Sequence, residues 1–276
     1  MGQRPKTIRV MIAAHKPYRM PQDAMYLPLH VGAEGKTDAN GAPLDLGWQK
    51  DNTGDHISGK NASYCELTAL YWGWKNLKAD YLGLVHYRRY FMYRRKGKDP
   101  FGNILTGREA QALFRKYRVI VPAKRRYYIE TLYSHYAHTH YSEHLDLAKQ
   151  IILEQCPEYA GSLKQVYARR WGYMFNMQIM ERPLMDAYCA WLFPILEELE
   201  KRCRTRDLSF FQGRFYGRVS EILFNVWLME QQRQGVLAAA EIKELPCIYM
   251  EPVNRVKKGI TFLQARFFHK KYEGSF

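Results

Sequence analysis

The stretch SYCELTALYWGWKNLKADYLGLVHYRRYF, residues 63–91, contains the clearest helix and strand patterns of the chain. Apolar residues recur at helical spacing in its first part, which predicts an amphipathic helix over 63–78. Ser63, followed three positions later by Glu66, has the pattern of a capping box at the start of that helix. The apolar run YLGLV at 81–85 is typical of a strand that is covered on both faces. Helix, turn and buried strand together predict an α/β fold.

A cationic and aromatic cluster follows this strand directly, from His86 to Tyr90. In open α/β sheets, ligands bind beyond the carboxyl ends of the strands. The two adjacent guanidinium groups of Arg88 and Arg89 match phosphate oxygens in pairs. We therefore expect a phosphate-bearing ligand here. Because both arginines stand at a strand end, a discrete pocket is favoured over an extended nucleic-acid surface.

The rest of the chain alternates between strand and helix patterns without an internal repeat, which predicts one domain over 1–276 with a mixed central sheet and a helical C-terminal part. The many glycines and prolines in the stretch 18–62 predict a long functional loop. Alternation over 173–180 places Asn176 and Gln178 on one face of a strand. Further strands are expected at 8–13 and 118–121, and further helices at 108–116, 127–155, 184–199 (kinked at Pro194) and 218–230.

The composition of the 276-residue chain indicates a folded protein with an anionic partner. Hydrophobic residues make up 47% of it, which is enough for a core, while 42 basic against 27 acidic residues give a net charge of +15. This balance is typical of proteins that bind nucleic acid, an acidic membrane surface or phosphorylated ligands. Five cysteines without a C-x-x-C pair indicate ordinary thiols of a reducing compartment.

The sequence predicts a cytoplasmic protein, since it has no secretory signal and no run of ~18 apolar residues. The tail 253–276 carries six basic residues and one acid, interleaved with Phe262 and Phe267. Such a tail suits the surface of an anionic bilayer, and packing of the same tail onto the domain is the alternative.

A histidine-rich segment lies at 134–144. His140 and His144, four residues apart, could share a helical face and chelate zinc. No further cysteine or histidine pattern completes a ligand set, so a surface or supporting cluster of histidines is favoured.

Several motifs resemble one bacterial family, first catalogued as a domain of unknown function, whose members are regarded as capsular and exopolysaccharide glycosyltransferases. The resemblance covers essentially the whole chain and implies a GT-A-like, nucleotide-sugar-dependent transferase. Its motifs are His15-Lys16, YLPLHVG (26–32), DNTGDHIS (51–58) with Lys60-Asn61, YCELTALYWGWKN (64–76) and GLVHYRRYF (83–91).

Under this resemblance, side chains at the N-terminal motifs would hold the donor, and Arg88 and Arg89 would stabilise the departing diphosphate. A carboxylate would act as base for the acceptor hydroxyl in an inverting displacement, with Glu221 as first candidate and Asp55 as second. Asn176 and Gln178 would bind sugar hydroxyls. The expected donor-binding residues are His15, Lys16, Asn61, Glu66 and His86.

In the GT-A fold, an Asp-x-Asp motif holds a divalent metal on the donor diphosphate. This sequence contains no Asp-x-Asp, and His86-Tyr87-Arg88-Arg89 stands at the corresponding strand end. We therefore assign no metal ligands and no tightly bound cofactor, and expect cationic side chains to neutralise the diphosphate.

The sequence thus predicts a hexosyltransferase that uses a UDP-sugar, with galactose in pyranose or furanose form as the first candidate. The expected acceptor is a lipid-linked unit of a capsule, O-antigen or exopolysaccharide, at the inner face of the plasma membrane. The rival from another class is a non-catalytic nucleic-acid-binding protein, because tyrosines are interleaved with the basic runs 88–98 and 115–126.

Overall fold

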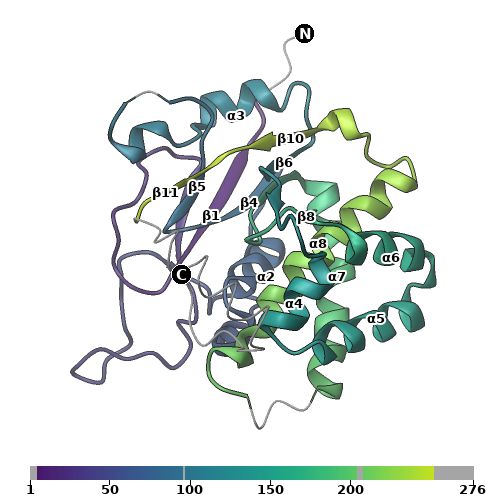
Figure 1. The fold of residues 1–276 in the computed structure, drawn as a ribbon. Helices are drawn as coiled ribbons and strands as arrows, with labels where there is room; N and C mark the ends of the chain where they lie inside the picture. Colours follow the sequence, from purple (N-terminus) through teal and green to yellow (C-terminus); the bar gives the residue numbers. More distant parts are fainter. Residues whose placement is uncertain (1–4, 96, 204–207, 252–276) are drawn as a thin grey trace. The chain divides into compact units, whose positions relative to one another are not determined.

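The computed structural model describes residues 5–95, 97–203 and 208–251 (Figure 1). The tail 253–276 therefore lies outside the described residues. Where the sequence predicts one domain, the chain groups into two compact units. Of the described residues, the first unit comprises those within 5–123, 176–189 and 238–251, and the second comprises those within 124–175 and 190–237.

The first unit contains a mixed sheet of nine strands among the described residues. β1, β2, β3 and β4 are mutually parallel, whereas β9 runs antiparallel to its neighbours β4 and β6. The order across the sheet is β10-β6-β9-β4-β1-β2-β3, and β5 joins β4 to β11. The strands are β1 (Ile8–Ala14), β2 (Tyr26–His30), β3 (Gln49–Lys50), β4 (Tyr81–His86), β5 (Arg89–Phe91), β6 (Val119–Pro122), β9 (Gln178–Glu181), β10 (Ile242–Leu245) and β11 (Cys247–Tyr249).

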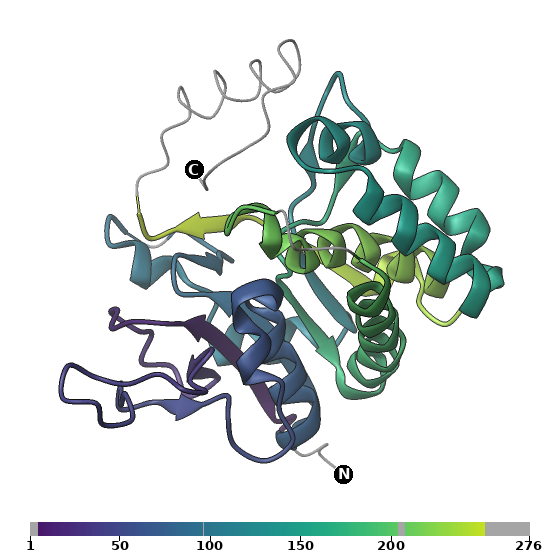
Figure 2. The same ribbon diagram turned by 90° about the horizontal axis from the view of Figure 1, so that it is seen from below.

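β1 and β4 form the buried centre of this sheet, as their apolar runs predict. Helix α2 (Leu67–Asn76) packs against both strands (Figure 2). The approach is close, because a Cβ added at Gly73 would lie 2.1 Å from Sδ of Met11. The other helices described in this unit are α1 (Asn61–Tyr64), α3 (Gly107–Leu113), the first part of α7 (Arg182–Arg202) and three short 3₁₀ turns at Ser58–Lys60, Pro100–Asn103 and Ala239–Glu241.

The expected capping box at Ser63 is wrong. Ser63 lies inside α1, and its hydroxyl donates to the carbonyl oxygen of Lys60. Cys65 then adopts a positive φ of 54°, which ends α1, and α2 begins at Leu67 without a side-chain cap. Glu66 is therefore released from capping and bonds elsewhere, as described below.

Two other expectations change. The stretch 18–62 is not a loop throughout, since β2 and β3 lie within it. The alternating strand expected at 173–180 is reduced to β9, because Phe175 and Asn176 have φ values of 80° and 49°. Asn176 therefore precedes the strand instead of sharing a face with Gln178.

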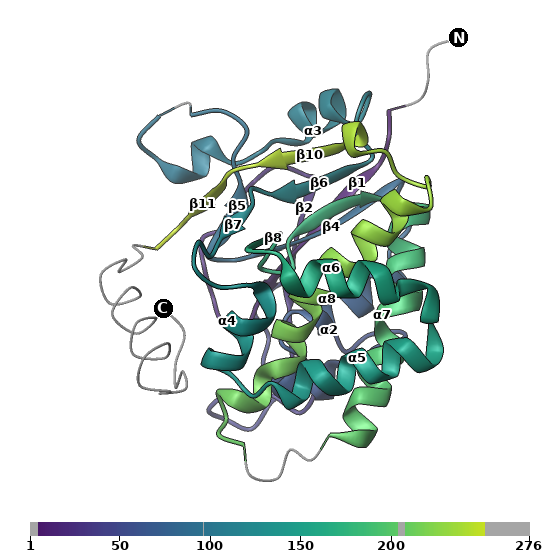
Figure 3. The ribbon, with the colours of Figure 1, turned by 45° about the vertical axis from the view of Figure 1, so that its right-hand side comes forward.

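The second unit is mainly helical (Figure 3). α6 packs against α8, where the Ser162 hydroxyl donates to the buried carboxylate of Glu230 at 2.7 Å. The helix expected at 218–230 is confirmed, and Pro194 lies inside the continuous helix α7. The helical stretch expected at 127–155 is divided into two helices, which begin at Leu132 and Glu143, and residues 127–131 precede the first of them. The elements are α4 (Leu132–Thr139), α5 (Glu143–Gln155), the 3₁₀ turns Pro157–Tyr159 and Gln212–Arg214, α6 (Ala160–Ala168), the rest of α7, α8 (Phe215–Arg233), and a ribbon of β7 (Arg125–Arg126) with β8 (Trp171–Gly172).

All five cysteines are free thiols, as expected. Among the helices of the described residues, none is both long and apolar enough to span a bilayer.

Candidate active site

The carboxyl ends of the four parallel strands meet at one edge of the sheet in the first unit. β2 and β3 extend the sheet on one side of β1, whereas β4 lies on the other side. The gap between β1 and β4 is therefore a topological switch point, the place where open α/β sheets bind ligands. The register aligns Ala13 with His86 and Ala14 with His30, so the residues that follow these strands converge there.

An aromatic pair lies across this switch point. The rings of Tyr18 and Tyr87 stack with 3.8 Å between centroids, and His15 meets Tyr87 edge-on at 5.5 Å. Nζ of Lys16 lies 5.3 Å from the Tyr18 ring, and the guanidinium of Arg88 lies 5.2 Å from the Tyr87 ring. Burial, reinforced by a hydrogen bond with Tyr18, raises the pKa of Tyr87, so its phenol is neutral. The pair is an apolar surface with a cation on each side.

The two predicted arginines have different surroundings, because His86 pairs with Arg89 and leaves Tyr87-Arg88 as the turn between β4 and β5. The side chain of Arg88 is 50% exposed and lies 3.6 Å from the Glu251 carboxylate. Arg89 is half-buried, with its guanidinium 5.0 Å from the ring centre of Tyr249 on β11. Arg88 can therefore move toward a ligand, whereas Arg89 is held by the sheet.

Glu66 and Asn176 join the start of α2 to the start of β9. Gln178 pairs with Leu84 near the carboxyl end of β4, so β9 begins at the switch-point edge. Just before it, Asn176 Nδ2 donates to Glu66 Oε1 at 2.7 Å. Gln178 is 1% exposed, and its Oε1 has no hydrogen-bond partner among the described residues. This corner thus offers a carboxylate and two amides.

Asp51 and Asn61 shape the loop that follows β2. Asp51 is fully buried and accepts the backbone N–H groups of Gly32 and Ala33 at 2.9 and 3.1 Å, as well as the Ser58 hydroxyl. A Cβ at Gly32, whose φ is 65°, would lie 2.6 Å from Oδ1 of Asn61. Asn61, expected to bind the donor, therefore packs directly under the loop, and Asp51 is its internal anchor.

The two candidate bases, Asp55 and Glu221, belong to different units. Asp55 accepts the Tyr71 hydroxyl at 3.0 Å and lies 3.8 Å from Nζ of Lys75, near the C-terminal end of α2. Glu66 precedes the other end of this ten-residue helix, about 15 Å away. Asp55 is thus held at the edge opposite the switch point. Glu221 belongs to the second unit, on α8, where its carbonyl oxygen accepts from Asn225 Nδ2 at 2.8 Å.

The charged side chains that follow β1 and β4, those of Lys16, Arg88 and Arg89, are cations. Imidazole and guanidinium groups stand at the end of β4, and the oxygens of Asp51 are already engaged by the loop. Among the residues that the structure describes, no group of three histidine, cysteine, aspartate or glutamate side chains is arranged to hold a metal ion.

A surface pocket opens at the opposite edge of the first unit, lined by Thr7, Lys75, Asp80, Arg182 and Asp186 among others. Its charged groups are engaged by the fold. Arg182 donates to Asp186 and to the carbonyl oxygen of Trp74, and Asp80 accepts from Thr7. We assign the pocket no role in the reaction.

The comparisons with known proteins agree with this geometry. A family model described as "Domain of unknown function (DUF4422)" matches residues 9–232. The chain belongs to the DUF4422 family. Among solved structures, the apo structure of the bifunctional glycosyltransferase WbbM matches with a TM-score of 0.79 and 29% sequence identity. The match covers 89% of this chain and 46% of WbbM, so the chain spans less than half of that protein. No curated protein matches the sequence.

The family resemblance expected from the sequence is thus confirmed, and so is the GT-A-like α/β fold with its mixed central sheet. Of the expected site residues in this DUF4422 chain, those at strand ends lie together at the switch point. The structure adds the stacking of Tyr18 on Tyr87 and the role of Asp51 as loop anchor, which the sequence analysis did not predict. The sequence does contain a tyrosine close to the end of each of the two strands, in HKPY (15–18) after β1 and in HYRR (86–89) at the end of β4. These tyrosines form the stacked pair.

The histidines of the second unit have protein partners. His140 Nδ1 lies 2.9 Å from Gln212 Oε1, and His144 Nδ1 lies 3.0 Å from the Tyr136 hydroxyl. Burial lowers the pKa of His140 to about 3 and that of His144 to about 4, so both are neutral near pH 7. His140 and His144 thus bond to different protein side chains, which agrees with the favoured interpretation that these histidines support the fold.

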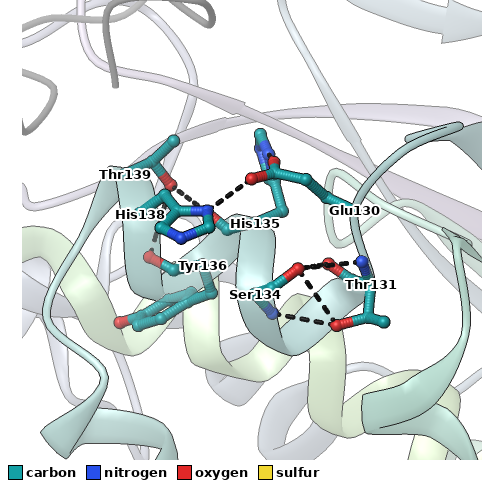
Figure 4. Close-up of polar contacts among 7 residues, drawn as sticks. All are labelled: Glu130, Thr131, Ser134, His135, Tyr136, His138 and Thr139. Atoms are coloured by element: carbon teal, nitrogen blue, oxygen red, sulfur yellow. Dashed lines mark hydrogen bonds and ion pairs between the residues drawn. The ribbon is translucent and has the colours of Figure 1, made fainter. Parts of the chain in front are cut away.

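Glu130 organises the other two histidines (Figure 4). Its buried carboxylate accepts from Nδ1 of His135 at 2.8 Å and from Nδ1 of His138. Burial alone would raise the pKa of Glu130, but these hydrogen bonds outweigh it and hold the pKa below its usual value. The ionised carboxylate ties α4 to the turn that precedes it.

Proposed function

We propose that this DUF4422 chain is a glycosyltransferase that moves a hexosyl unit, galactosyl as first candidate, from a UDP-sugar to a lipid-linked acceptor of surface-polysaccharide synthesis. The observation that carries the proposal is the gathering of cations and a stacked aromatic pair at the switch point between β1 and β4. The likeness to WbbM, whose name states glycosyltransferase activity, supports the reaction class. The specific sugar and acceptor are part of the proposal.

In this proposal the nucleotide binds across the switch point. The Tyr18–Tyr87 pair gives the base an apolar surface, with His15 and His86 beside it. Lys16, Arg88 and Arg89 supply positive charge for the diphosphate. Charge on the leaving oxygens grows as the glycosidic bond breaks, so preorganised cations stabilise the transition state more than the bound donor.

The sugar would occupy the corner formed by Glu66, Asn176 and Gln178. Amide and carboxylate groups bind sugar hydroxyls through directed hydrogen bonds, and Glu66 and Asn176 supply both kinds of group here. Glu221 remains the first proposed base for the acceptor hydroxyl. Glu66 joins it because it is the carboxylate of this corner, whereas the position of Asp55 favours a structural role.

The proposal also places the protein at the inner face of the membrane, since a lipid-linked acceptor is confined there. A thermal-shift series tests the reaction class, with UDP, GDP and UDP-galactose set against a random-sequence oligonucleotide. We expect UDP and UDP-galactose to raise the melting temperature saturably, as a ligand that binds only the folded state must. Stabilisation by the oligonucleotide alone, with a steep loss on adding salt, would instead support the nucleic-acid-binding rival.

A further inference from the structure

The β7–β8 ribbon of the second unit ends in an apolar turn that the proposed reaction does not use. Tyr128 and Ile129 form this turn and are 76% and 55% exposed. Tyr128 has a positive φ of 54°. Single exposed apolar residues are ordinary on protein surfaces, but two adjacent ones at a turn form a small apolar tip.

The ribbon around this tip is strongly cationic. No acidic residue occurs at 123–129 or 168–173, the two segments that form it. The next carboxylate, that of Glu130, is buried and occupied by two histidines. The surface beside the apolar tip carries the exposed basic side chains of Arg126 and Arg170. The other basic residues of the ribbon, Lys124, Arg125 and Arg169, are half-buried.

The turn is fixed by hydrogen bonds on both sides. The Tyr127 N–H donates to the Arg170 carbonyl oxygen at 2.8 Å, and the Arg170 guanidinium donates to the Tyr128 carbonyl oxygen at 3.2 Å. Below the turn, the Glu130 carboxylate holds His135 and His138 of α4 (Figure 4). A tip that is already ordered loses little conformational entropy on binding.

We propose that this ribbon docks on an anionic lipid bilayer, with Tyr128 and Ile129 inserted at the headgroup level and the exposed side chains of Arg126 and Arg170 facing lipid phosphates. Rings with a polar end and basic side chains are the residues that suit this interface. A nucleic acid fits less well, because successive bases need several free aromatic faces on which to stack. The Trp171 ring already has Lys124 and Arg169 4.5 Å from its centre, and Tyr128 is a single exposed ring beside an isoleucine.

This inference rests on the proposed function only for its purpose, because a lipid-linked acceptor lies in the same bilayer. Co-sedimentation with vesicles of phosphatidylcholine, alone or with phosphatidylserine, tests it on the full chain. We expect binding only to the anionic vesicles. The double variant Tyr128→Ser/Ile129→Ser should weaken it about tenfold, and Arg126→Ser about fivefold.

Two matched controls come from other surfaces of the same unit. Val236→Ser removes a side chain that is 45% exposed, and Lys164→Ser removes an exposed cation of α6. Both should bind vesicles as the unchanged protein does. Equal vesicle binding by the Tyr128→Ser/Ile129→Ser variant and the unchanged protein would overturn the proposal, as would a random oligonucleotide that displaces the vesicles from the ribbon.

UDP binding, measured by calorimetry on the same proteins, separates the two proposals. The ribbon variants should keep it. Vesicle binding without UDP binding would refute the proposed reaction and leave the docking surface standing. UDP binding without vesicle binding would refute the docking surface alone.

Discussion

Arg88 and Arg89 are adjacent in sequence, yet only Arg88 is free to follow a ligand. Its contact with Glu251 is an ion pair between half-exposed side chains, which contributes about 0–1 kcal/mol to stability. We therefore expect Arg88→Ala to leave the melting temperature nearly unchanged while lowering turnover about 10²- to 10³-fold, the cost of removing one preorganised donor from a developing negative charge. Initial rates of UDP release from a UDP-sugar, with and without acceptor, measure this effect.

Arg89→Ala should also lower turnover, but with some loss of stability, because Arg89 packs over Tyr249. Arg95→Ala is the matched control, since Arg95 is an exposed cation of the same basic run. If Arg88→Ala and Arg89→Ala both kept the turnover of the Arg95→Ala control, these arginines would belong to a solvated surface and the proposed role would be lost.

Among the elements, the junction of α2 and β9 contains Asn176, where the effect of the backbone conformation can be separated from the effect of the side-chain amide. Asn176 combines a left-handed backbone, with φ of 49°, and an amide that donates to Glu66. Asn176→Gly keeps the backbone accessible and removes the amide, whereas Asn176→Ala also adds about 1–2 kcal/mol of left-handed strain. We expect both variants to lose turnover, and Asn176→Ala to melt at the lower temperature. Full turnover in Asn176→Gly would show that the amide serves packing alone.

Helices and strands with a continuous pattern of apolar residues could be predicted from the sequence. Those that depend on contacts with residues far apart in the sequence could not. β4 was foreseen because its apolar run needs cover on both faces, whatever the neighbours. β2 was missed because Pro28 and the surrounding turn residues hide a strand that is recognisable only by its pairing with β1. The capping pattern at Ser63 failed because Cys65 breaks the helix, which left Glu66 for Asn176.

The same distinction applies to the site. The ends of the two central strands could be recognised in the sequence. A position at the edge of the sheet could therefore be predicted for His15, His86, Arg88 and Arg89. The Tyr18–Tyr87 stack depends on β4 lying beside β1, a fact of sheet order that local patterns do not contain.

At the scale of the whole molecule, the charge balance bears on how the donor diphosphate is neutralised. With 42 basic against 27 acidic residues, the chain attracts anionic ligands through its overall field, and salt screens this attraction. The switch point adds cations where an Asp-x-Asp motif would add carboxylates, and the carboxylate of Asp51 is occupied by backbone N–H groups. We therefore propose that positive charge from the protein takes the place of a metal ion at the diphosphate.

We accordingly expect calorimetry to give nearly the same UDP affinity in EDTA and in millimolar manganese, and a weaker affinity as sodium chloride is raised. Arg88→Ala should lose affinity in both media alike, because in this proposal manganese does not contribute to donor binding. A loss of more than about tenfold in EDTA, equivalent to about 1.4 kcal/mol, would show that a divalent ion takes part in donor binding. In that case the carboxylate of Glu66 is the first ligand to test, since it lies at the same edge of the sheet and Glu66→Gln would remove its charge while keeping its shape.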